Sequence, residues 1–169
     1  SDVYAMGGSP IMAIGILGWP IEQLGAEIAA EVISGAQSIC DQAGIPLAGG
    51  HSIDSREPFF GLSVTGLVKK EDLKTNGQAQ PGDTLYLTKP IGSGILSTAM
   101  KRGLSQPDED ELLMSELVKL NRIGKDLSII SGVNALTDVT GFGLMGHLIE
   151  VCQASKVQAE LDFDSVPTY

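Results

Sequence analysis

The residues best suited to chemistry lie between Thr137 and His147, where an acidic side chain stands beside a glycine-rich turn. Asp138 offers a hard oxygen ligand, and the glycines let backbone N–H groups approach an anion closely. An apolar helical pattern begins directly after the turn, so the first N–H groups of a helix would face that anion. This combination is typical of a loop that binds a polyphosphate with its Mg²⁺. The spacing is neither a Walker A motif nor GxGxxG.

A second acidic residue stands near glycines at the start of the chain. Asp2 precedes a Gly7-Gly8 turn and could be another metal ligand, although the same residues would equally fit a helix cap and an ordinary turn. Because Asp2 and Asp138 each lie beside glycine-rich backbone, the sequence predicts that they share one Mg²⁺–polyphosphate site. Two aspartates are few for a site with several metals, so we expect a further ligand from elsewhere.

A third candidate loop, Ala48–Ser52, contains two glycines followed by a histidine and a serine. Successive N–H groups in a Gly49-Gly50 turn could surround a phosphate, and the Ser52 hydroxyl could donate to it. His51 could supply a proton, act as a neutral hydrogen-bonding partner, or be a structural histidine whose hydrogen bonds are satisfied. The sequence leaves these roles open.

Two further features have simple structural explanations. The segment Lys89–Gly94 leads from a predicted strand into a helix, and is either a fourth anion site or an ordinary connection. His147 lies in the helix after the Asp138 turn, near Glu150, and we expect it to be structural because nothing pairs it with another metal ligand. No nucleophile is recognisable, since the chain has no GxSxG and no serine paired with a base.

The composition is that of a globular protein with an acidic surface. Of 169 residues, 43% are hydrophobic, and 21 acidic against 11 basic residues give a net charge of −10. That charge repels nucleic acid and anionic lipid, so neither is expected as a partner, and a nucleotide would enter as its magnesium complex. The apolar run Ile11–Ile21 is too short for a membrane span. Cys40 and Cys152 fall on apolar helical stripes and are expected to be reduced, because the composition is typical of a cytoplasmic protein.

The hydrophobic pattern predicts strands interleaved with helices, and therefore a mixed α/β or α+β architecture. A polar segment at 69–82, punctuated by glycine and proline, is the best candidate for a linker. Strands are expected at 11–17, 46–53, 59–68, 84–88 and 157–163, and helices at 20–43, 93–102, 107–130 and from the last glycine turn to about 154.

Five blocks, in this order along the chain, resemble the selenophosphate synthetase (selenide, water dikinase) family. They are SDVYAMGG at 1–8, ILGWP at 16–20, AGGHSID at 48–54, LTKPIG at 87–92 and TDVTGFGLMGH at 137–147. Glycine turns and aspartate loops recur in the wider superfamily of aminoimidazole ribonucleotide synthetase, with its hydrogenase maturation and thiamin-monophosphate kinase members. The Asp138 block and ILGWP are much more specific to the selenium enzyme.

The resemblance implies a reaction in which ATP, selenide and water give selenophosphate, AMP and phosphate, with Mg²⁺ required. It implies that Asp2 contacts both ATP and Mg²⁺ and that Asp138 is a further Mg²⁺ ligand. It also implies an ATP-contacting segment made of Gly50, His51 and Ser52. Catalysis would then consist mostly of positioning and charge neutralisation.

The resemblance further implies a two-domain aminoimidazole ribonucleotide synthetase-like fold, truncated at both ends, from a protein that forms a homodimer. Residues 1–76 would be the latter part of an N-terminal ATP-binding and dimerisation domain, and 77–169 the first part of a C-terminal α+β domain. The family's glycine-rich N-terminal segment, with its reactive Cys or selenocysteine and its Lys, has no counterpart here. We therefore assign no catalytic residue and expect no turnover from the chain alone.

Two other functions stay open at the level of the sequence. A sister-family kinase or synthetase that acts on a small metabolite would carry similar loops, although the Asp138 block argues against it. A non-catalytic dimerisation fragment would fit the missing nucleophile segment.

Overall fold

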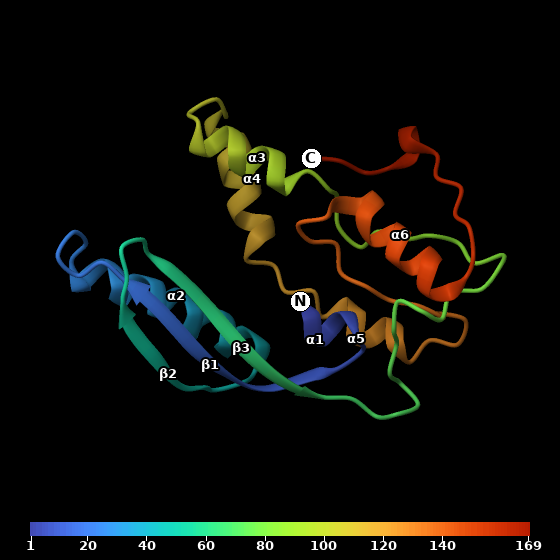
Figure 1. Cartoon of the computed structure of the whole chain (residues 1–169), viewed down its shortest axis with the longest axis horizontal. Helices are drawn as coiled ribbons and strands as arrows, with labels where there is room; N and C mark the ends of the chain where they lie inside the picture. Colours follow the sequence, from blue (N-terminus) through green and yellow to red (C-terminus); the bar gives the residue numbers. More distant parts are fainter. The chain divides into compact units, whose positions relative to one another are not determined.

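The computed structural model describes all 169 residues, which form two compact units (Figure 1). The sheet unit consists of Gly8–Glu71, and the helical unit consists of Ser1–Gly7 together with Asp72–Tyr169. The first seven residues therefore pack with the second half of the chain. This places the segment containing Asp2 and the Asp138 loop in one unit.

The sheet unit contains a three-stranded sheet and one long helix (Figure 1). The central strand β1 is parallel to β2 and antiparallel to β3. A parallel pair needs a crossover, and α2 provides it between β1 and β2. The bounds are β1 Ser9–Trp19, α2 Ala26–Ala43, β2 Leu47–Asp54 and β3 Phe59–Leu67.

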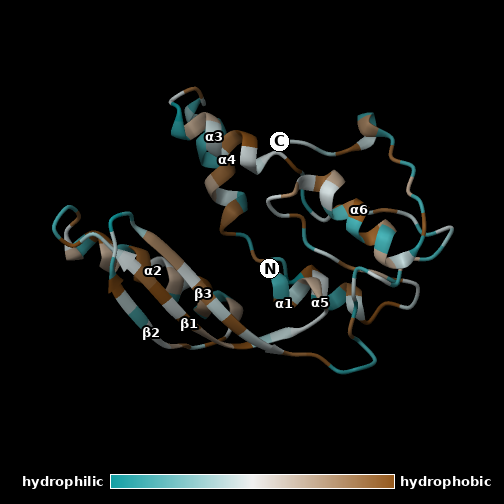
Figure 2. Cartoon of the chain, in the orientation of Figure 1, coloured by the Kyte–Doolittle hydropathy of each residue, from teal (hydrophilic) through white to brown (hydrophobic).

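The core of the sheet unit lies between the sheet and α2. Ala13 and Cys40 are almost completely buried, and Ile45 packs with them. Side chains alternate across a strand, so the neighbours Ile14 and Ile16 face the opposite side of the sheet, where they are 45% and 44% exposed. Figure 2 shows hydrophobic residues along these strands. One face of the sheet is therefore covered by α2, and the other is apolar and open.

The helix predicted from Pro20 begins later, at Ala26, and that part of the prediction is wrong. Residues 21–24 form a separate turn in which the Leu24 N–H donates to the Pro20 carbonyl. The Trp19 indole N–H donates to the Leu24 carbonyl at 3.1 Å. Gly25 is extended and caps the helix, so the apolar pattern alone could not locate the true start.

The helical unit is built from short helices and loops. α1 packs against α5, and α3 packs against α4. A side chain at Gly124 would place its Cβ 2.3 Å from the Tyr4 carbonyl oxygen, so the contact between α1 and α5 requires a glycine there. The bounds are α1 Asp2–Ala5, α3 Ser93–Lys101, α4 Pro107–Leu117, α5 Ile123–Ser128, α6 Gly143–Ser155 and the 3₁₀ turn η1 Phe163–Ser165.

Three predictions for the helical unit are wrong. The single helix expected at 107–130 is divided into α4 and α5, with residues 118–122 between them. The expected strands at 84–88 and 157–163 do not form, and the β pairing in this part of the chain is one bridge between Ile91 and Thr168. An alternating apolar pattern makes a strand only where a partner strand pairs with it. The helices predicted at 93–102 and after the last glycine turn are confirmed.

Both cysteines are free thiols and lie on helices, as predicted. Cys40 is buried in α2, and Cys152 is half-buried in α6. No helix of the chain has the length and apolar character needed to cross a membrane.

Candidate metal and nucleotide site

The Asp138 carboxylate meets the start of the chain within the helical unit. The Ser1 hydroxyl donates to Asp138 Oδ2 at 3.0 Å, and the Asn121 side-chain amide donates to Ser1 Oγ at 3.2 Å. The residue directly before Asp2 therefore contacts Asp138, 137 positions along the chain. The sequence prediction identified neither Ser1 nor Asn121, because no spacing rule relates residues so far apart.

The packing of α1 against α5 fixes the position of this segment. The Ser128 hydroxyl donates to the Lys125 carbonyl at 2.7 Å and lies 3.5 Å from the Gly7 carbonyl oxygen. The Lys74 N–H donates to the Met6 carbonyl at 3.3 Å. Gly7 adopts a φ of 80°, and an added Cβ would meet the Ser128 side chain. Asp2 thus lies on a helix that is anchored at its end.

The turn after Asp138 is held by the helix that follows it. The Thr140 N–H donates to Nε2 of His147 at 3.1 Å, and the Gly143 N–H donates to the Thr140 carbonyl at 2.9 Å. Gly143 adopts a φ of 70°, which favours glycine at the point where the turn becomes α6. His147 is structural, as predicted, but it has a specific partner that the sequence did not indicate.

The two predicted metal ligands suit Mg²⁺ accompanied by a nucleotide. Asp138 is half-buried and Asp2 is exposed. The chain contains no group of three or more His, Cys, Asp or Glu residues that could hold a metal ion by itself. Mg²⁺ is often bound through one or two carboxylates, with waters and substrate phosphates as its other ligands. The donor set of Asp2 and Asp138 is therefore one that a magnesium–phosphate complex could complete.

The third predicted loop is not a turn, and that prediction is wrong. Gly49 and Gly50 lie inside β2, and Gly50 pairs with Gly15 of β1. Ala13 is opposite Leu47 while Gly15 is opposite Gly50, so β2 holds one extra residue there, and Gly49 adopts a φ of 139°. A Cβ on Gly50 would lie 2.1 Å from the Gly15 carbonyl oxygen. These glycines accommodate a bulge and a close approach between strands.

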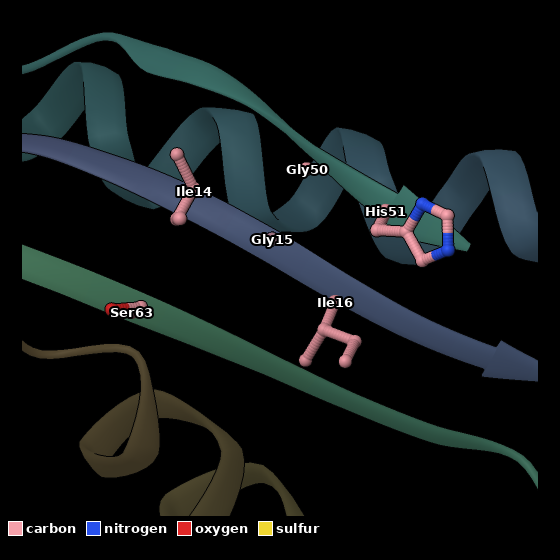
Figure 3. A pocket seen from close by; sticks show the side chains of 6 residues that line it. All are labelled: Ile14, Gly15, Ile16, Gly50, His51 and Ser63. Atoms are coloured by element: carbon pink, nitrogen blue, oxygen red, sulfur yellow. The ribbon is translucent and has the colours of Figure 1, made fainter. Parts of the chain in front are cut away.

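His51 lies on the open face of the sheet. The register places it beside Ile16, while Ser52 is beside Leu17, so the two side chains point to opposite faces. His51 lines a shallow hollow to which all three strands contribute (Figure 3). A ligand bound in that hollow could contact the His51 side chain but could not also contact the Ser52 hydroxyl. The hollow is lined by Ile14, Gly15, Ile16, Gly50, His51 and Ser63.

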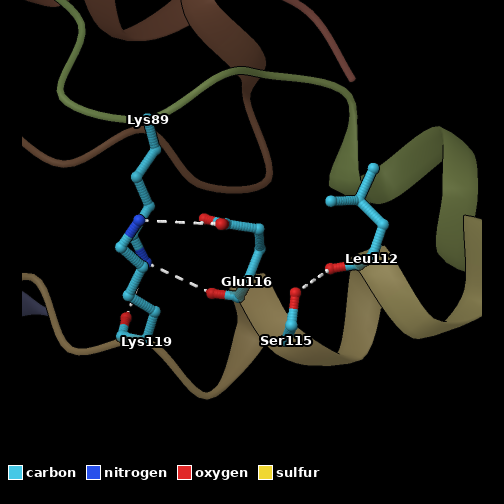
Figure 4. Close-up of polar contacts among 5 residues, drawn as sticks. All are labelled: Lys89, Leu112, Ser115, Glu116 and Lys119. Atoms are coloured by element: carbon cyan, nitrogen blue, oxygen red, sulfur yellow. Dashed lines mark hydrogen bonds and ion pairs between the residues drawn. The ribbon is translucent and has the colours of Figure 1, made fainter.

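Lys89 stabilises the end of α4. Its ammonium group donates to the carbonyl oxygens of Glu116 at 3.2 Å and Lys119 at 2.6 Å, and the Lys119 ammonium lies 3.6 Å from the Glu116 carboxylate (Figure 4). A cation at a helix C-terminus interacts favourably with the helix dipole. Partial burial lowers the pKa of Lys89, against the opposing effect of Glu116. Of the two roles left open for Lys89–Gly94, these contacts favour an ordinary connection.

The sequence matches one family over both halves of the chain. Residues 1–68 match the AIR synthase related protein, N-terminal domain, and residues 80–169 match the AIR synthase related protein, C-terminal domain. The chain belongs to the AIR synthase related protein family. The predicted two-domain fold of this family is confirmed. The boundary expected between residues 76 and 77 remains a prediction.

Two curated relatives carry the same name. The selenide, water dikinase of Shewanella baltica (strain OS155) is 59% identical over 167 residues, which are 99% of this chain and 47% of that protein. The selenide, water dikinase of Aeromonas hydrophila subsp. hydrophila is 56% identical, over 99% of this chain and 48% of that protein. The predicted resemblance is thereby confirmed. The chain spans about half the length of the curated relatives it matches.

Solved structures show the same fold at lower identity. Thiamine-monophosphate kinase from Stenotrophomonas maltophilia K279a has a TM-score of 0.85 at 23% identity, over 99% of this chain and 54% of that chain. AaThiL complexed with AMPPCP and TMP has a TM-score of 0.74 at 23% identity, over 91% of this chain and 50% of that chain. This likeness supports the AIR synthase related fold of both halves.

Proposed function

We propose that this chain carries the Mg-ATP-binding part of a selenophosphate synthetase, which converts ATP, selenide and water into selenophosphate, AMP and phosphate. The selenide, water dikinases at 56–59% identity support the reaction. The observation that carries the metal assignment is the hydrogen bond between Ser1 and Asp138, because it brings the segment containing Asp2 to the second carboxylate.

In this proposal Asp2 and Asp138 hold the magnesium ion, and Asp2 also contacts ATP. Bound Mg²⁺ would supply charge neutralisation at the phosphate oxygens. The Ser1 hydroxyl orients the Asp138 carboxylate by occupying Oδ2. The solved complex of AaThiL with AMPPCP supports a nucleotide as the ligand of this fold.

Gly50, His51 and Ser52 are the proposed ATP contacts in the sheet unit. His51 and Ser52 are exposed, and Gly50 exposes backbone beside the hollow. Because the side chains of His51 and Ser52 leave opposite faces of β2, we propose that only one of them contacts the phosphates directly.

A homodimer and a cytoplasmic location complete the proposal. The open face of the sheet presents Ile14 and Ile16, and exposed apolar residues of this kind are typical of a surface that pairs with another subunit. Both thiols are free, which supports a reducing compartment.

The same open face favours a second candidate, a dimerisation module without catalysis. Calorimetric titration of the 169-residue chain with Mg-ATP distinguishes the two. The principal proposal predicts saturable heat that Asp138→Asn weakens and that Asp164→Asn, at an exposed carboxylate in η1, leaves unchanged. A purely structural module would give no heat of binding.

The reaction itself is tested in a full-length protein that contains this chain. Supplied with ATP and selenide, it is expected to form AMP and phosphate. Mass-spectrometric detection of ADP as the sole nucleotide product would instead indicate the sister-family kinase.

A further inference from the structure

His147 is the buried partner of the turn that carries Asp138. The residue is 8% exposed, and its Nε2 lies 3.1 Å from both the backbone nitrogen and the hydroxyl of Thr140, two residues after Asp138. The Phe142 ring packs against the imidazole in a tilted arrangement, with ring centroids 5.8 Å apart. The side chain therefore touches the turn at two positions between the acidic residue and α6.

The contact with Thr140 determines which nitrogen of His147 carries the proton. A backbone N–H can only donate, so Nε2 must be the unprotonated acceptor of a neutral imidazole. The proton then lies on Nδ1, which is buried and has Glu150 Oε2 3.4 Å away. A carboxylate in that position favours the Nδ1–H tautomer. The Glu150 carboxylate therefore lies beside Nδ1 without a hydrogen bond to it, and Nε2 on the other side of the ring accepts from the turn at Thr140.

This arrangement leaves His147 no free lone pair for a metal ion. Its Nε2 lone pair faces the Thr140 N–H, and its Nδ1 faces the Glu150 carboxylate. Its contribution to the site must therefore pass through the backbone of the turn. Partners that orient metal ligands in this indirect way commonly change metal affinity about 10- to 100-fold when they are removed.

We propose that His147 is a positioning residue for Asp138, and that Glu150 maintains the tautomer that His147 needs. The imidazole holds the Thr140 N–H, and the turn so fixed presents the Asp138 carboxylate to the ion. This inference rests on the proposed function, in which Asp138 is a magnesium ligand. It assigns a role to His147 beyond packing.

Two substitutions of His147 separate positioning from packing. His147→Gln retains an oxygen acceptor near the position of Nε2, whereas His147→Leu fills similar space without an acceptor. In the 169-residue chain, amide hydrogen exchange at Thr140 reports the turn, and ¹⁵N shifts of the wild-type imidazole report the tautomer. Titration with Mn²⁺ and ATP, followed by electron paramagnetic resonance, reports the ion site.

We expect His147→Leu to accelerate exchange at Thr140 and to raise the apparent Kd for Mn-ATP about tenfold. His147→Gln should stay within about threefold of wild type in both readouts, because an acceptor for the Thr140 N–H remains. The wild-type shifts should show a proton on Nδ1 and none on Nε2.

The proposal is overturned if Gln and Leu have equal effects, if Nε2 carries the proton, or if Leu leaves exchange at Thr140 unchanged. Asp138→Asn is the reference variant. If it weakens Mn-ATP binding and His147→Leu does not, His147 has no positioning role and the metal site stands. If Asp138→Asn itself has no effect, the metal assignment fails, and the role proposed for His147 fails with it.

Discussion

Ser1 and Asp138, separated by 137 positions in the sequence, are joined by a hydrogen bond of 3.0 Å. Asn121 extends the contact by donating to the same hydroxyl. The start of the chain, the loop before α5 and the loop before α6 therefore meet at the Ser1 hydroxyl. This contact brings the residue next to Asp2 to the Asp138 carboxylate, although no local motif connects the two acidic residues.

Gly50 is required by the close approach of two strands. Gly50→Ala would push a Cβ to 2.1 Å from the Gly15 carbonyl oxygen, and overpacking of this kind costs about 1–3 kcal/mol of the free energy of unfolding. Gly35→Ala is the matched control, because Gly35 lies within α2 with nothing within 4 Å of the added Cβ. It should stabilise by about 0.5–1 kcal/mol.

Urea unfolding of both glycine variants measures these changes. Equal changes in the free energy of unfolding for Gly50→Ala and Gly35→Ala would show that Gly50 does not lie as close to the Gly15 carbonyl as described.

Lys89 is expected to stabilise the junction between α4 and α5. Lys89→Met removes both hydrogen bonds from the ammonium group to the helix-end carbonyls and should lower the free energy of unfolding by about 1–2 kcal/mol. Lys101→Met, at an exposed lysine in the last turn of α3, should change it by less than about 0.5 kcal/mol. Similar losses for the two variants would contradict the role of Lys89.

The pH dependence of stability gives a second test of Lys89. Burial, its largest cause, lowers the pKa of the folded ammonium group below 10.5. Between the folded pKa and 10.5 the unfolded chain binds more protons, so this group makes the free energy of unfolding rise with pH in that window. Lys89→Met should remove this rise, measured as the difference from wild type in urea unfolding. If the difference in free energy of unfolding between wild type and Lys89→Met does not change with pH in this range, the ammonium group is not buried as described.

Cys40 is expected to react much more slowly than Cys152 with a thiol reagent at neutral pH. Cys40 is 2% exposed, and burial, followed by the charge of Asp41, raises the pKa of its thiol above 9.0. Since the thiolate is the reactive form, a single fast phase is expected from the half-buried Cys152. Cys152→Ala should abolish that phase, and a fast phase that persists in this variant would contradict the burial of Cys40.

The raised pKa of Cys40 also predicts that the free energy of unfolding falls at alkaline pH. The contribution of the Cys40 thiol to stability is fully present below pH 9.0. It is lost as the pH rises through the pKa of the folded thiol, because the unfolded thiol loses its proton first. Cys40→Ala should remove this part of the alkaline loss in urea unfolding. The same decrease of the free energy of unfolding with pH in wild type and in Cys40→Ala would contradict this assignment.

The sequence predicted local features well and distant contacts poorly. The strands expected at 11–17, 46–53 and 59–68 are the three strands of the sheet, and each of them pairs with a neighbour. The same reasoning joined α4 and α5 into one helix, since the pattern does not show that Lys89 binds carbonyls at the end of α4. It also read Gly49-Gly50 as a turn, because glycine is common to turns and to strands that approach closely.

In the candidate site, too, the residues recognised from local sequence were predicted, and the residues brought in by distant contacts were not. Asp2 and Asp138 were predicted from glycine-rich surroundings, which are local, while Ser1 and Asn121 act through contacts more than 100 residues apart. The role of Thr140 was also missed, although His147 is only seven residues away. The sequence spacing could place Thr140 and His147 on one side of a turn. The hydrogen bond from the Thr140 N–H to the ring nitrogen of His147, however, depends on the conformation of that turn.

The most direct test of the account is a double-mutant cycle on Asp2 and Asp138, with the affinity of the chain for Mn-ATP as the measured quantity. If both carboxylates bind one ion, Asp2→Asn and Asp138→Asn should each raise the Kd about tenfold, which is ~1.4 kcal/mol, and the double variant should lose much less than the sum. Losses that simply add would indicate two independent sites. An affinity unchanged by either substitution would contradict the shared magnesium site altogether.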